Sequence, residues 1–474
     1  MSGVASGHLL LPVAERFIDD TLTPVSAFLK LRRLAPEEPA FLLESAEQGI
    51  QVGRWSFIGI KPRAVLRWSL DDGGDPFRLA GDLIAHNAQM ELDDPPPFTG
   101  GAVGYFGYDL VRTVEPLGEP NPDPLGIPDM ALMTTDVIVA FDHLKHTITV
   151  IANGEVTGAG EEQARRRAAE TIASVRAALA GPLPQLARGA AVPPPRFSSN
   201  VSPERFEAMV ARIIEYIHAG DAFQVVPSQR FSAALPVAPF SVYRGLRAVN
   251  PSPYMYYLDF GDFQLAGASP EPHLRVSGTL ASTRPVAGTR PRGETPAADE
   301  RIAAELLADE KERAEHVMLV DLARNDLGRV CRAGSVSVDS LMSIERYSHV
   351  MHIVSAVSGR LREDMDAMEA LRATLPAGTL SGAPKVRAMQ IIDELEPHKR
   401  GGYGGAIGYL SYNGDLDTCI HIRTVLIKDG HAHIQAGGGT VADARPERER
   451  AESEAKASAM IHAIELACEQ EGWE

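Results

Sequence analysis

The sequence of 474 residues predicts an α+β fold. Strand-like runs such as 254–260, 263–269 and 406–412 follow one another closely, and short turns such as "NGD" and "KDG" separate several of them. Long, charged helical segments also occur in the second half. Strands joined by short turns favour antiparallel sheets with helices outside them over a regular βαβ series. The length suggests two or three domains.

The clearest boundary is a segment rich in Pro, Gly and Ala at 181–200, which predicts a linker. We therefore expect an N-terminal domain at 1–180 and a C-terminal domain at 201–474.

The segments beside this linker have recognisable local signals. The run 148–156 predicts a β-hairpin that turns at Asn153-Gly154. The following segment, 161–180, has the composition of a helix. Ser202-Pro203 then predicts another helix start, because Ser can cap the first turn and Pro suits its first position.

The composition argues against several classes of partner. With 63 acidic and 46 basic residues, the formal net charge is −17, so nucleic acid or an anionic membrane is not expected as the main partner. The three Cys residues are widely separated and form no CxxC pair. A disulfide framework or a zinc site is therefore not expected, and a reducing cytoplasm fits. We find neither a signal peptide nor a membrane span in the sequence.

Two helical segments carry paired acids. Glu312 and Glu315 are three residues apart and share one helix face. Glu449 and Glu452 repeat this spacing, and Lys456 follows four residues later. Mg²⁺ prefers oxygen ligands and takes one or two protein carboxylates, so these acids are candidate magnesium ligands. The alternative is a solvated helix face with ordinary ion pairs.

Three Gly-rich turns, at 284–293, 376–389 and 435–441, offer backbone N–H groups that can surround an anion. None is a Walker motif or a GxGxxG after a strand, so nucleotide binding is not indicated. Together with Arg423, they suggest a pocket for a small carboxylated molecule.

Ordered motifs in the second half resemble those of the chorismate-utilising enzymes. They include "GDAFQVVPSQRF", "GASPE", "PVAGTR", "EHVMLVDLARNDLGRV", "GTLSGAPK", "DTCIHIRT" and "AGGGTV", followed by a C-terminal "ExxExxxK". The first half matches more thinly, through 41–45 and 53–59. The resemblance implies two large antiparallel β-sheets packed face to face with helices outside. It also implies a smaller, interleaved N-terminal regulatory region.

The resemblance is strongest to the members that make anthranilate, the first step from chorismate toward tryptophan. In that reaction chorismate takes up ammonia at C2, loses its C4 hydroxyl and then eliminates pyruvate. Glu315 and Glu452 match the Mg²⁺ ligands of the family, with Glu312 and Glu449 as supporting acids. The metal would hold the ring carboxylate, and so supply the positive charge that an acidic chain lacks.

Further positions match the residues that hold the substrate in the family. These are Gly288, Thr289, Thr379, Tyr403, Arg423, Gly437, Gly439 and Lys456. Arg suits a planar carboxylate because it offers two parallel donors.

Two positions match catalytic groups of the family. Glu271 matches the general acid that protonates the departing C4 hydroxyl, which requires a carboxyl group kept neutral by burial. Its alternative is an ordinary turn carboxylate after Pro270. His352 matches the catalytic histidine, and its alternative is a core residue of a strand. His349 is expected to be structural.

Two positions discriminate among the members of the family. Relatives that add water at C2 carry a basic Lys where this chain has Gln224, and ammonia needs no such base. Relatives that aminate C4 carry a Lys nucleophile where this chain has Ala287. Gln224 with Ala287 therefore predicts amination at C2. The alternatives are an aminodeoxychorismate synthase component I, or a non-catalytic regulator that binds chorismate or tryptophan.

The resemblance also implies regulation and a partner. Glu44 and Ser45, with Pro253, Tyr254 and Met255, match segments that bind tryptophan in feedback-inhibited members. No segment resembles a glutaminase with a nucleophilic Cys. We therefore expect ammonia to come from free ammonium or from a separate glutamine amidotransferase subunit, with the pair doubled into a heterotetramer.

Overall fold

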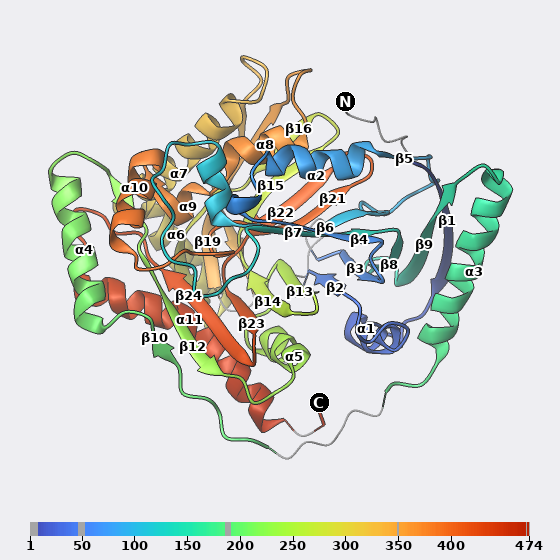
Figure 1. The fold of residues 1–474 in the computed structure, drawn as a ribbon. Coiled ribbons are helices and arrows are strands. Elements are labelled where there is room, and N and C mark those ends of the chain that lie inside the picture. Colours follow the sequence, from blue (N-terminus) through green and yellow to red (C-terminus); the bar gives the residue numbers. More distant parts are fainter. Residues whose placement is uncertain (1–7, 46–52, 185–190, 348–349, 471, 474) are drawn as a thin grey trace.

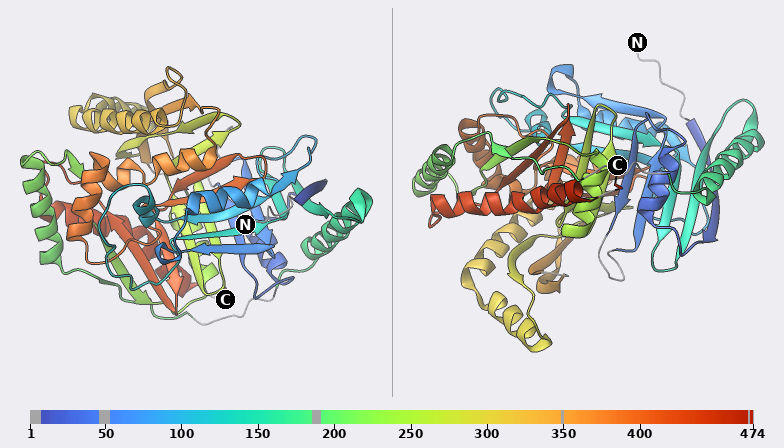
Figure 2. Two further views of the ribbon diagram at one scale, coloured as in Figure 1. Left: turned by 45° about the horizontal axis from the view of Figure 1, so that its top comes forward. Right: turned by 90° about the horizontal axis from the view of Figure 1, so that it is seen from below.

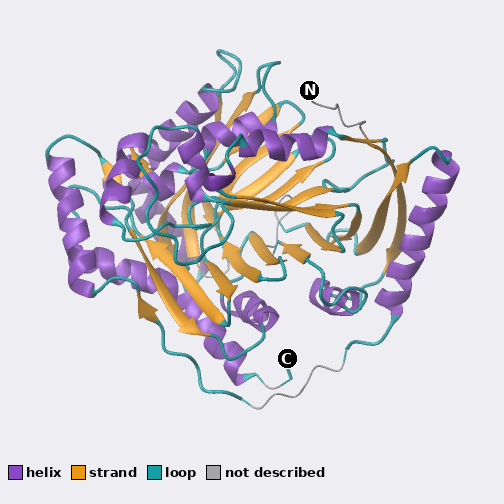
Figure 3. Ribbon diagram, viewed as in Figure 1, coloured by secondary structure: helices purple, strands orange, loops and turns teal. Residues whose placement is uncertain are grey.

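A computed structural model describes residues 8–45, 53–184, 191–347, 350–470 and 472–473. The described residues form two large sheets packed face to face, with helices on their outer faces (Figures 1 and 3). All strand pairings in these sheets are antiparallel except that of β1 with β5. The predicted α+β fold with two large antiparallel sheets is confirmed.

The larger sheet contains 12 strands. In spatial order they are β10 (Ser198–Ser199), β12 (Ser228–Ala234), β24 (His431–Gly437), β23 (Thr424–Lys428), β14 (Phe263–Ser269), β13 (Tyr254–Asp259), β2 (Ala40–Glu44), β3 (Trp55–Ile60), β8 (Val137–Asp142), β9 (Thr147–Val156), β1 (His8–Ile18) and β5 (Asn87–Gln89).

The second sheet contains 10 strands. Its main path is β17 (Val286–Pro291), β19 (Val350–Arg360), β16 (Leu280–Thr283), β15 (Pro272–Ser277), β22 (Leu416–Ile420), β21 (Ala406–Ser411), β6 (Gly101–Phe106), β7 (Met130–Thr135) and β4 (Ala64–Trp68), with β18 (Ser337–Arg346) paired to β19. A separate two-stranded ladder joins β11 (Gln224–Val225) to β20 (Gly382–Ala383).

Helices cover the outer face of each sheet. The described α-helices are α1 (Pro24–Arg32), α2 (Pro76–Ala85), α3 (Gly160–Ala180), α4 (Pro203–His218), α5 (Pro239–Val249), α6 (Pro296–Ala308), α7 (Glu310–Gly328), α8 (Ala367–Thr374), α9 (Gly378–Ser381), α10 (Lys385–Leu395) and α11 (Pro446–Glu469). Apolar residues of α1, α3, α5 and α11 pack on the 12-stranded sheet, whereas those of α2, α7 and α8 pack on the other. Two further views show the helices outside the sheets (Figure 2). None of the described helices has the length and hydropathy to cross a bilayer.

A third apolar layer lies between the sheets. Phe41, Tyr256 and Leu265 of the larger sheet and Tyr105 and Ile407 of the smaller one contribute to it, and all are buried. Burial of large side chains on facing sheets is a main source of stability for such a fold.

Both halves of the chain contribute strands to both sheets, and in each sheet the strands of the two halves form two blocks that meet at one pair of strands. In the larger sheet, β2 from the first half pairs with β13 from the second, with Glu44 opposite Met255. In the smaller sheet, β6 pairs with β21 in the same way. The limits of the two domains at 180 and 200 stay a prediction.

The hairpin predicted at Asn153-Gly154 is wrong, because both residues lie inside the continuous strand β9. The Asn153 side chain donates hydrogen bonds to Thr99 O and Asp136 O. These bonds to other segments take the place of the local hydrogen bonds that an Asn side chain makes in a turn. A Cβ atom at Gly154 would lie 2.4 Å from Ala164 O of α3. The glycine therefore permits close packing of α3 on the strand rather than a reversal of the chain.

The helix start predicted after the linker is confirmed. Helix α4 begins at Pro203, and the Ser202 hydroxyl accepts a hydrogen bond from Arg205 N. Helix α3 and the strands at 254–259, 263–269 and 406–411 also lie where the sequence predicts them.

Candidate active site

The paired acids of α7 and α11 come together beside β11. Gln224 Nε2 donates a hydrogen bond to Glu315 Oε1 over 3.3 Å. The pKa of Glu315 is raised, chiefly by burial and then by the negative charges of Glu312 and Glu452. Carboxylates from two helices that are distant in the sequence therefore share one environment.

Glu449 completes this acidic cluster. Burial and the charge of Glu452 raise the pKa of Glu449 to about 7. Its Oε2 atom is buried and has no hydrogen-bond partner among the described residues. A Cβ atom at Gly438 would lie 3.2 Å from Glu449 Oε2 and 3.3 Å from Glu452 Oε1, so the glycine lets the backbone pass close to both acids. Crowded carboxylates with unsatisfied oxygens are a donor set suited to a hard divalent cation.

Basic side chains partly neutralise the cluster. Lys456 Nζ lies 2.7 Å from Glu452 Oε1 and donates to Gly437 O over 3.0 Å. Arg290 Nη1 lies 2.9 Å from Glu312 Oε1. Within the described ranges, no three His, Cys, Asp or Glu side chains are grouped closely enough to enclose a metal. Because Mg²⁺ needs only one or two protein carboxylates, the magnesium site stays a prediction.

Glu271 and Arg423 lie where the chain crosses between the two sheets. Glu271 connects β14 to β15, and Arg423 connects β22 to β23. Backbone hydrogen bonds hold both connections, from Ile420 N to Glu271 O and from Ala268 N to Arg423 O. These corners bring the two side chains to the same region of the molecule.

Arg423 has a strained backbone and an unpaired side chain. Its φ of 52° lies in the left-handed region, which non-glycine residues adopt at an energetic cost and often at functional sites. Burial lowers the pKa of Arg423, and the nearby Tyr403 and Glu452 raise it. No ion pair joins Arg423 to another described residue, so its guanidinium is available for an anionic ligand.

Burial raises the pKa of Glu271 to about 7, while the neighbouring Thr379 hydroxyl and the charge of Lys456 lower it. Near neutral pH a large share of Glu271 therefore keeps its proton, as a general acid must. Thr379 lies in the short helix α9. The predicted acid Glu271 therefore lies near Thr379 and Lys456, two of the predicted substrate-binding residues.

His352 lies on β19, opposite Thr289 of β17. Its Nδ1 atom is 3.1 Å from both Gly288 O and Thr289 Oγ1. Because a carbonyl oxygen only accepts, Nδ1 carries the proton and Nε2 remains an acceptor. Burial lowers the pKa of His352, and Arg423 adds to this effect. The predicted catalytic histidine is therefore neutral and oriented.

The Gly-rich turns lie against the same groups. Gly288 has φ 63°, and a Cβ atom there would lie 3.1 Å from Glu312 Oε2. A Cβ atom at Gly439 would lie 2.4 Å from Gln224 Nε2, and one at Gly437 would lie 2.2 Å from Pro227 O. Glycine at these positions permits contacts that any side chain would block.

Tyr403 is buried, and desolvation raises its pKa to about 12, while the charge of Arg400 lowers it. The phenol therefore stays protonated and can donate to a ligand oxygen.

The sequence did not single out two residues of this site. Arg290 binds both Glu312 and Asp309, and Gly438 contacts two acids. Gly438 stands between two glycines that were selected, and Arg290 follows Thr289 directly. Their position next to selected residues was the signal in the sequence that could have identified them. His349 lies outside the described residues.

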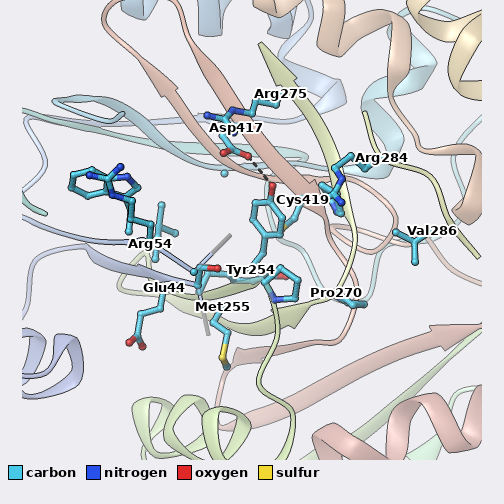
Figure 4. A pocket seen from close by; sticks show the side chains of 18 of the residues that line it. Glu44, Arg54, Tyr254, Met255, Pro270, Arg275, Arg284, Val286, Asp417 and Cys419 are labelled. Atoms are coloured by element: carbon cyan, nitrogen blue, oxygen red, sulfur yellow. Dashed lines mark hydrogen bonds between the residues drawn. The ribbon is translucent and has the colours of Figure 1, made fainter. Parts of the chain in front are cut away.

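A cavity of about 1380 Å³ lies between the two sheets (Figure 4). All five residues predicted for tryptophan line it, namely Glu44, Ser45, Pro253, Tyr254 and Met255. Tyr254 OH donates to Asp417 Oδ1 over 3.0 Å, as Figure 4 shows. The Ser45 hydroxyl is buried and has no partner within the described part of the chain.

The carboxylate of Glu44 points away from the centre of this cavity (Figure 4). It accepts a hydrogen bond from Tyr243 OH and lies 2.9 Å from Arg247 Nε, both on helix α5. Helix α5 packs directly on α11, since a Cβ atom at Gly245 would lie 2.2 Å from Ala463 O. Contacts therefore run from the cavity through α5 to the helix that carries Glu449, Glu452 and Lys456.

Comparisons with known proteins agree with this arrangement. Residues 38–462 match the chorismate binding enzyme family. Anthranilate synthase component 1 of Pseudomonas putida is 49% identical over 98% of this chain and 97% of its own length, and that of Thermus thermophilus is 48% identical over 96% and 98%.

Solved structures are also similar. Anthranilate synthase component I from Streptococcus pneumoniae has a TM-score of 0.79 at 38% identity, covering 94% of this chain and 99% of its own. The menaquinone-specific isochorismate synthase from Escherichia coli shares the fold, with a TM-score of 0.71 at 18% identity, over 98% of this chain and 96% of its own. The chain therefore belongs to the chorismate binding enzyme family, as its near-full-length similarity to relatives named anthranilate synthase component 1 shows.

Proposed function

We propose that this chorismate-utilising enzyme converts chorismate and ammonia into anthranilate and pyruvate, as the first step from chorismate toward tryptophan in the cytoplasm. The observation that carries the proposal is the convergence of Glu315, Glu452 and Gln224 from three distant segments. The names of the relatives point to the same reaction.

Glu315 and Glu452 would hold Mg²⁺, with Glu312 and Glu449 nearby. The unsatisfied Glu449 Oε2 and the raised pKa values of Glu315 and Glu449 fit such an ion, because a cation relieves the crowding of negative charge. When bound, Mg²⁺ supplies positive charge toward a substrate carboxylate.

Gln224 would orient the ammonia that attacks C2. Its Nε2 is bound to Glu315, whereas its Oε1 is buried and has no partner among the described residues. That oxygen can accept an N–H of ammonia. A neutral amide suffices because ammonia already carries a lone pair and needs no base. Ala287 has no amine that could compete as a nucleophile.

Glu271 would supply the proton that the C4 hydroxyl needs to leave as water. A C2–N bond forms, the ring double bonds shift and the C4–O bond breaks, and the attached nitrogen loses one proton to give the neutral amine. The pKa of about 7 suits this donation.

Pyruvate then leaves when the C2 proton is removed, the C3–O bond breaks and the ring becomes aromatic, and the departing enolate takes up a proton at its methylene carbon. Neutral His352, with its free Nε2, is the base that we assign to this proton.

The remaining groups would bind the two carboxylates of the substrate. Arg423 offers an unpaired guanidinium, and Lys456 and Tyr403 offer further donors. Gly288, Thr289, Thr379, Gly437 and Gly439 complete this set. Fixed donors of this kind orient the ring so that the reacting atoms meet.

A separate glutamine amidotransferase subunit would deliver ammonia to this chain, and we propose that the pair doubles into a heterotetramer. The names of the relatives, component 1, support a partner. Free ammonium would replace the partner in its absence.

Tryptophan would bind in the cavity between the sheets and inhibit the enzyme. The cavity is large enough for this amino acid, and all five residues of the predicted site line it. Binding there would act on the substrate site through the domain arrangement rather than by overlap.

One experiment tests the proposed reaction. The purified chain is mixed with chorismate, Mg²⁺ and an ammonium salt, and anthranilate fluorescence is followed over time. Fluorescence should grow with each of the three components and vanish with EDTA. Loss of chorismate without a fluorescent product would instead indicate amination alone or reaction at C4.

A further inference from the structure

Tyr403 also forms part of the wall of a second, much smaller cavity of about 30 Å³. Its polar lining includes Arg230, His421 and Gln435, and its apolar lining includes Leu265 and other aliphatic residues. This volume exceeds the roughly 10–15 Å³ that one water molecule needs, but it excludes polyatomic organic acids.

Arg230 contributes a buried charge to this cavity. The residue is only 6% exposed, and both its Nε and its Nη1 are buried without a hydrogen-bond partner among the described residues. Its backbone is satisfied by Asn200, so only the guanidinium lacks partners. A buried cation without a partner is costly by several kcal/mol, and Arg cannot escape that cost by losing its proton.

No described residue supplies the missing negative charge. None of the residues that line the cavity is acidic. Its other arginine, Arg400, is bound to Glu396 and to two carbonyl oxygens. The charge of Asp123 acts on Arg230, but Asp123 makes no ion pair with it and already accepts hydrogen bonds from Leu125 N and Gly126 N.

A neighbouring ring offers a further donor. His421 is 4% exposed, its Nδ1 has no partner within the described ranges, and burial lowers the pKa of its ring to about 3. A neutral imidazole carries one N–H, and its tautomer can place that proton on Nδ1. Gly402 packs against this ring and fixes its place, since a Cβ atom there would lie 2.1 Å from His421 Cε1.

We propose that this cavity binds a halide-sized inorganic anion such as chloride, held by Arg230 Nε and Nη1 and by the His421 ring. The anion neutralises the buried guanidinium and fills a space that borders the wall of the substrate site at Tyr403. It stabilises the folded chain, because an ion that binds only the folded state raises its stability with concentration.

Thermal unfolding of the full chain in sodium chloride against sodium gluconate, at constant ionic strength, tests this site. The wild type should show a Tm that rises by about 1–2 °C for each tenfold increase in chloride above the Kd. Arg230→Met keeps the volume of the side chain and removes its charge, so this chloride dependence should disappear.

Arg67→Met is the matched control, because Arg67 is paired with Asp262 and lies outside this cavity. This variant should keep the chloride dependence. Equal slopes for the wild type and Arg230→Met would overturn the proposal.

A second measurement does not depend on the folding of any variant. Crystals of the wild type grown in bromide should show an anomalous peak within hydrogen-bond distance of Arg230 Nε or Nη1. A cavity that holds only water in bromide would overturn the proposal. Neither outcome depends on the identity of the catalysed reaction.

Discussion

Gln224 Nε2 donates a hydrogen bond to Glu315 Oε1 over 3.3 Å, and so joins strand β11 to helix α7. The bond fixes one end of the amide and leaves its carbonyl oxygen buried without a partner within the described part of the chain. A neutral side chain therefore lies against an acid that the proposed function assigns to magnesium.

Gln224→Lys should reduce ammonia-dependent formation of anthranilate by about 100-fold or more, because the ammonium group would pair with Glu315 and the acceptor oxygen would be lost. Fluorescence at saturating chorismate and Mg²⁺ measures this rate. Gln264→Lys, at the opposite end of β14 from Glu271, is the control and should retain activity. Wild-type rates in Gln224→Lys would remove Gln224 from the site.

Glu315→Gln and Glu452→Gln should each weaken Mg²⁺ binding by at least about tenfold and reduce turnover more strongly. Titration calorimetry measures the affinity without relying on catalysis. Circular dichroism should show an unchanged fold, since both changes remove charge from a crowded cluster. The exposed Glu310 at the start of α7 provides the control, Glu310→Gln, which should bind Mg²⁺ normally. Unchanged Mg²⁺ affinity in both site variants would contradict the assignment.

The activity should fall as pH rises through about 7, because Glu271 loses the proton that it donates. Stability should show a related effect. The folded state keeps this proton between pH 4.5 and 7, whereas the unfolded state has lost it, so the free energy of unfolding falls as pH rises through this window.

Glu271→Gln should remove that part of the pH dependence of stability and reduce kcat by roughly 100-fold or more. Chemical denaturation at several pH values and a pH–rate profile measure the two effects. An identical pH–stability curve in the variant would show that Glu271 has an ordinary pKa.

Ser45→Phe should abolish or greatly weaken inhibition by tryptophan while kcat changes little. The new ring would occupy space in the cavity, where the Ser45 hydroxyl is buried. Dose–response curves with tryptophan measure the effect, and Ser198→Phe on the edge strand β10 serves as the control. Unchanged inhibition in Ser45→Phe would place the regulatory site elsewhere.

Tyr243→Phe should lower the free energy of unfolding by about 1–3 kcal/mol, because Glu44 is left with one fewer donor in a buried place. The tryptophan concentration for half-inhibition should also rise, whereas the KM for chorismate without tryptophan should stay near that of the wild type. Denaturant titration and inhibition curves give the two quantities. A loss of stability with unaltered inhibition would limit the Tyr243 contact to a structural role.

The parts of the fold that could be predicted from the sequence are those with local causes. The Ser202 cap and the strand at 263–269 depend on short-range preferences, and the structure has both. The Asn153-Gly154 turn failed because the cause there is tertiary, as the Asn side chain binds two distant carbonyl groups and α3 passes over the glycine.

The same distinction applies to the candidate site. The spacing of Glu312 and Glu315 could show that they share a helix face, but not that Glu452 approaches them. The strained φ of Arg423 and the carboxylate of Glu44 turned toward α5 depend on how sheets and helices meet. Such features have no signature in a single sequence.

The joining of an early block of strands to a late block in both sheets has a consequence during synthesis on the ribosome. When residues 40–44 and 101–106 emerge, each finds one neighbour nearby, while the other (254–259 or 406–411) has not yet been translated. Pairings between such distant segments form slowly and leave strand edges open in the meantime. The nascent chain therefore completes its fold only near the end of translation, and cutting the gene at the linker would yield two fragments with complementary open edges.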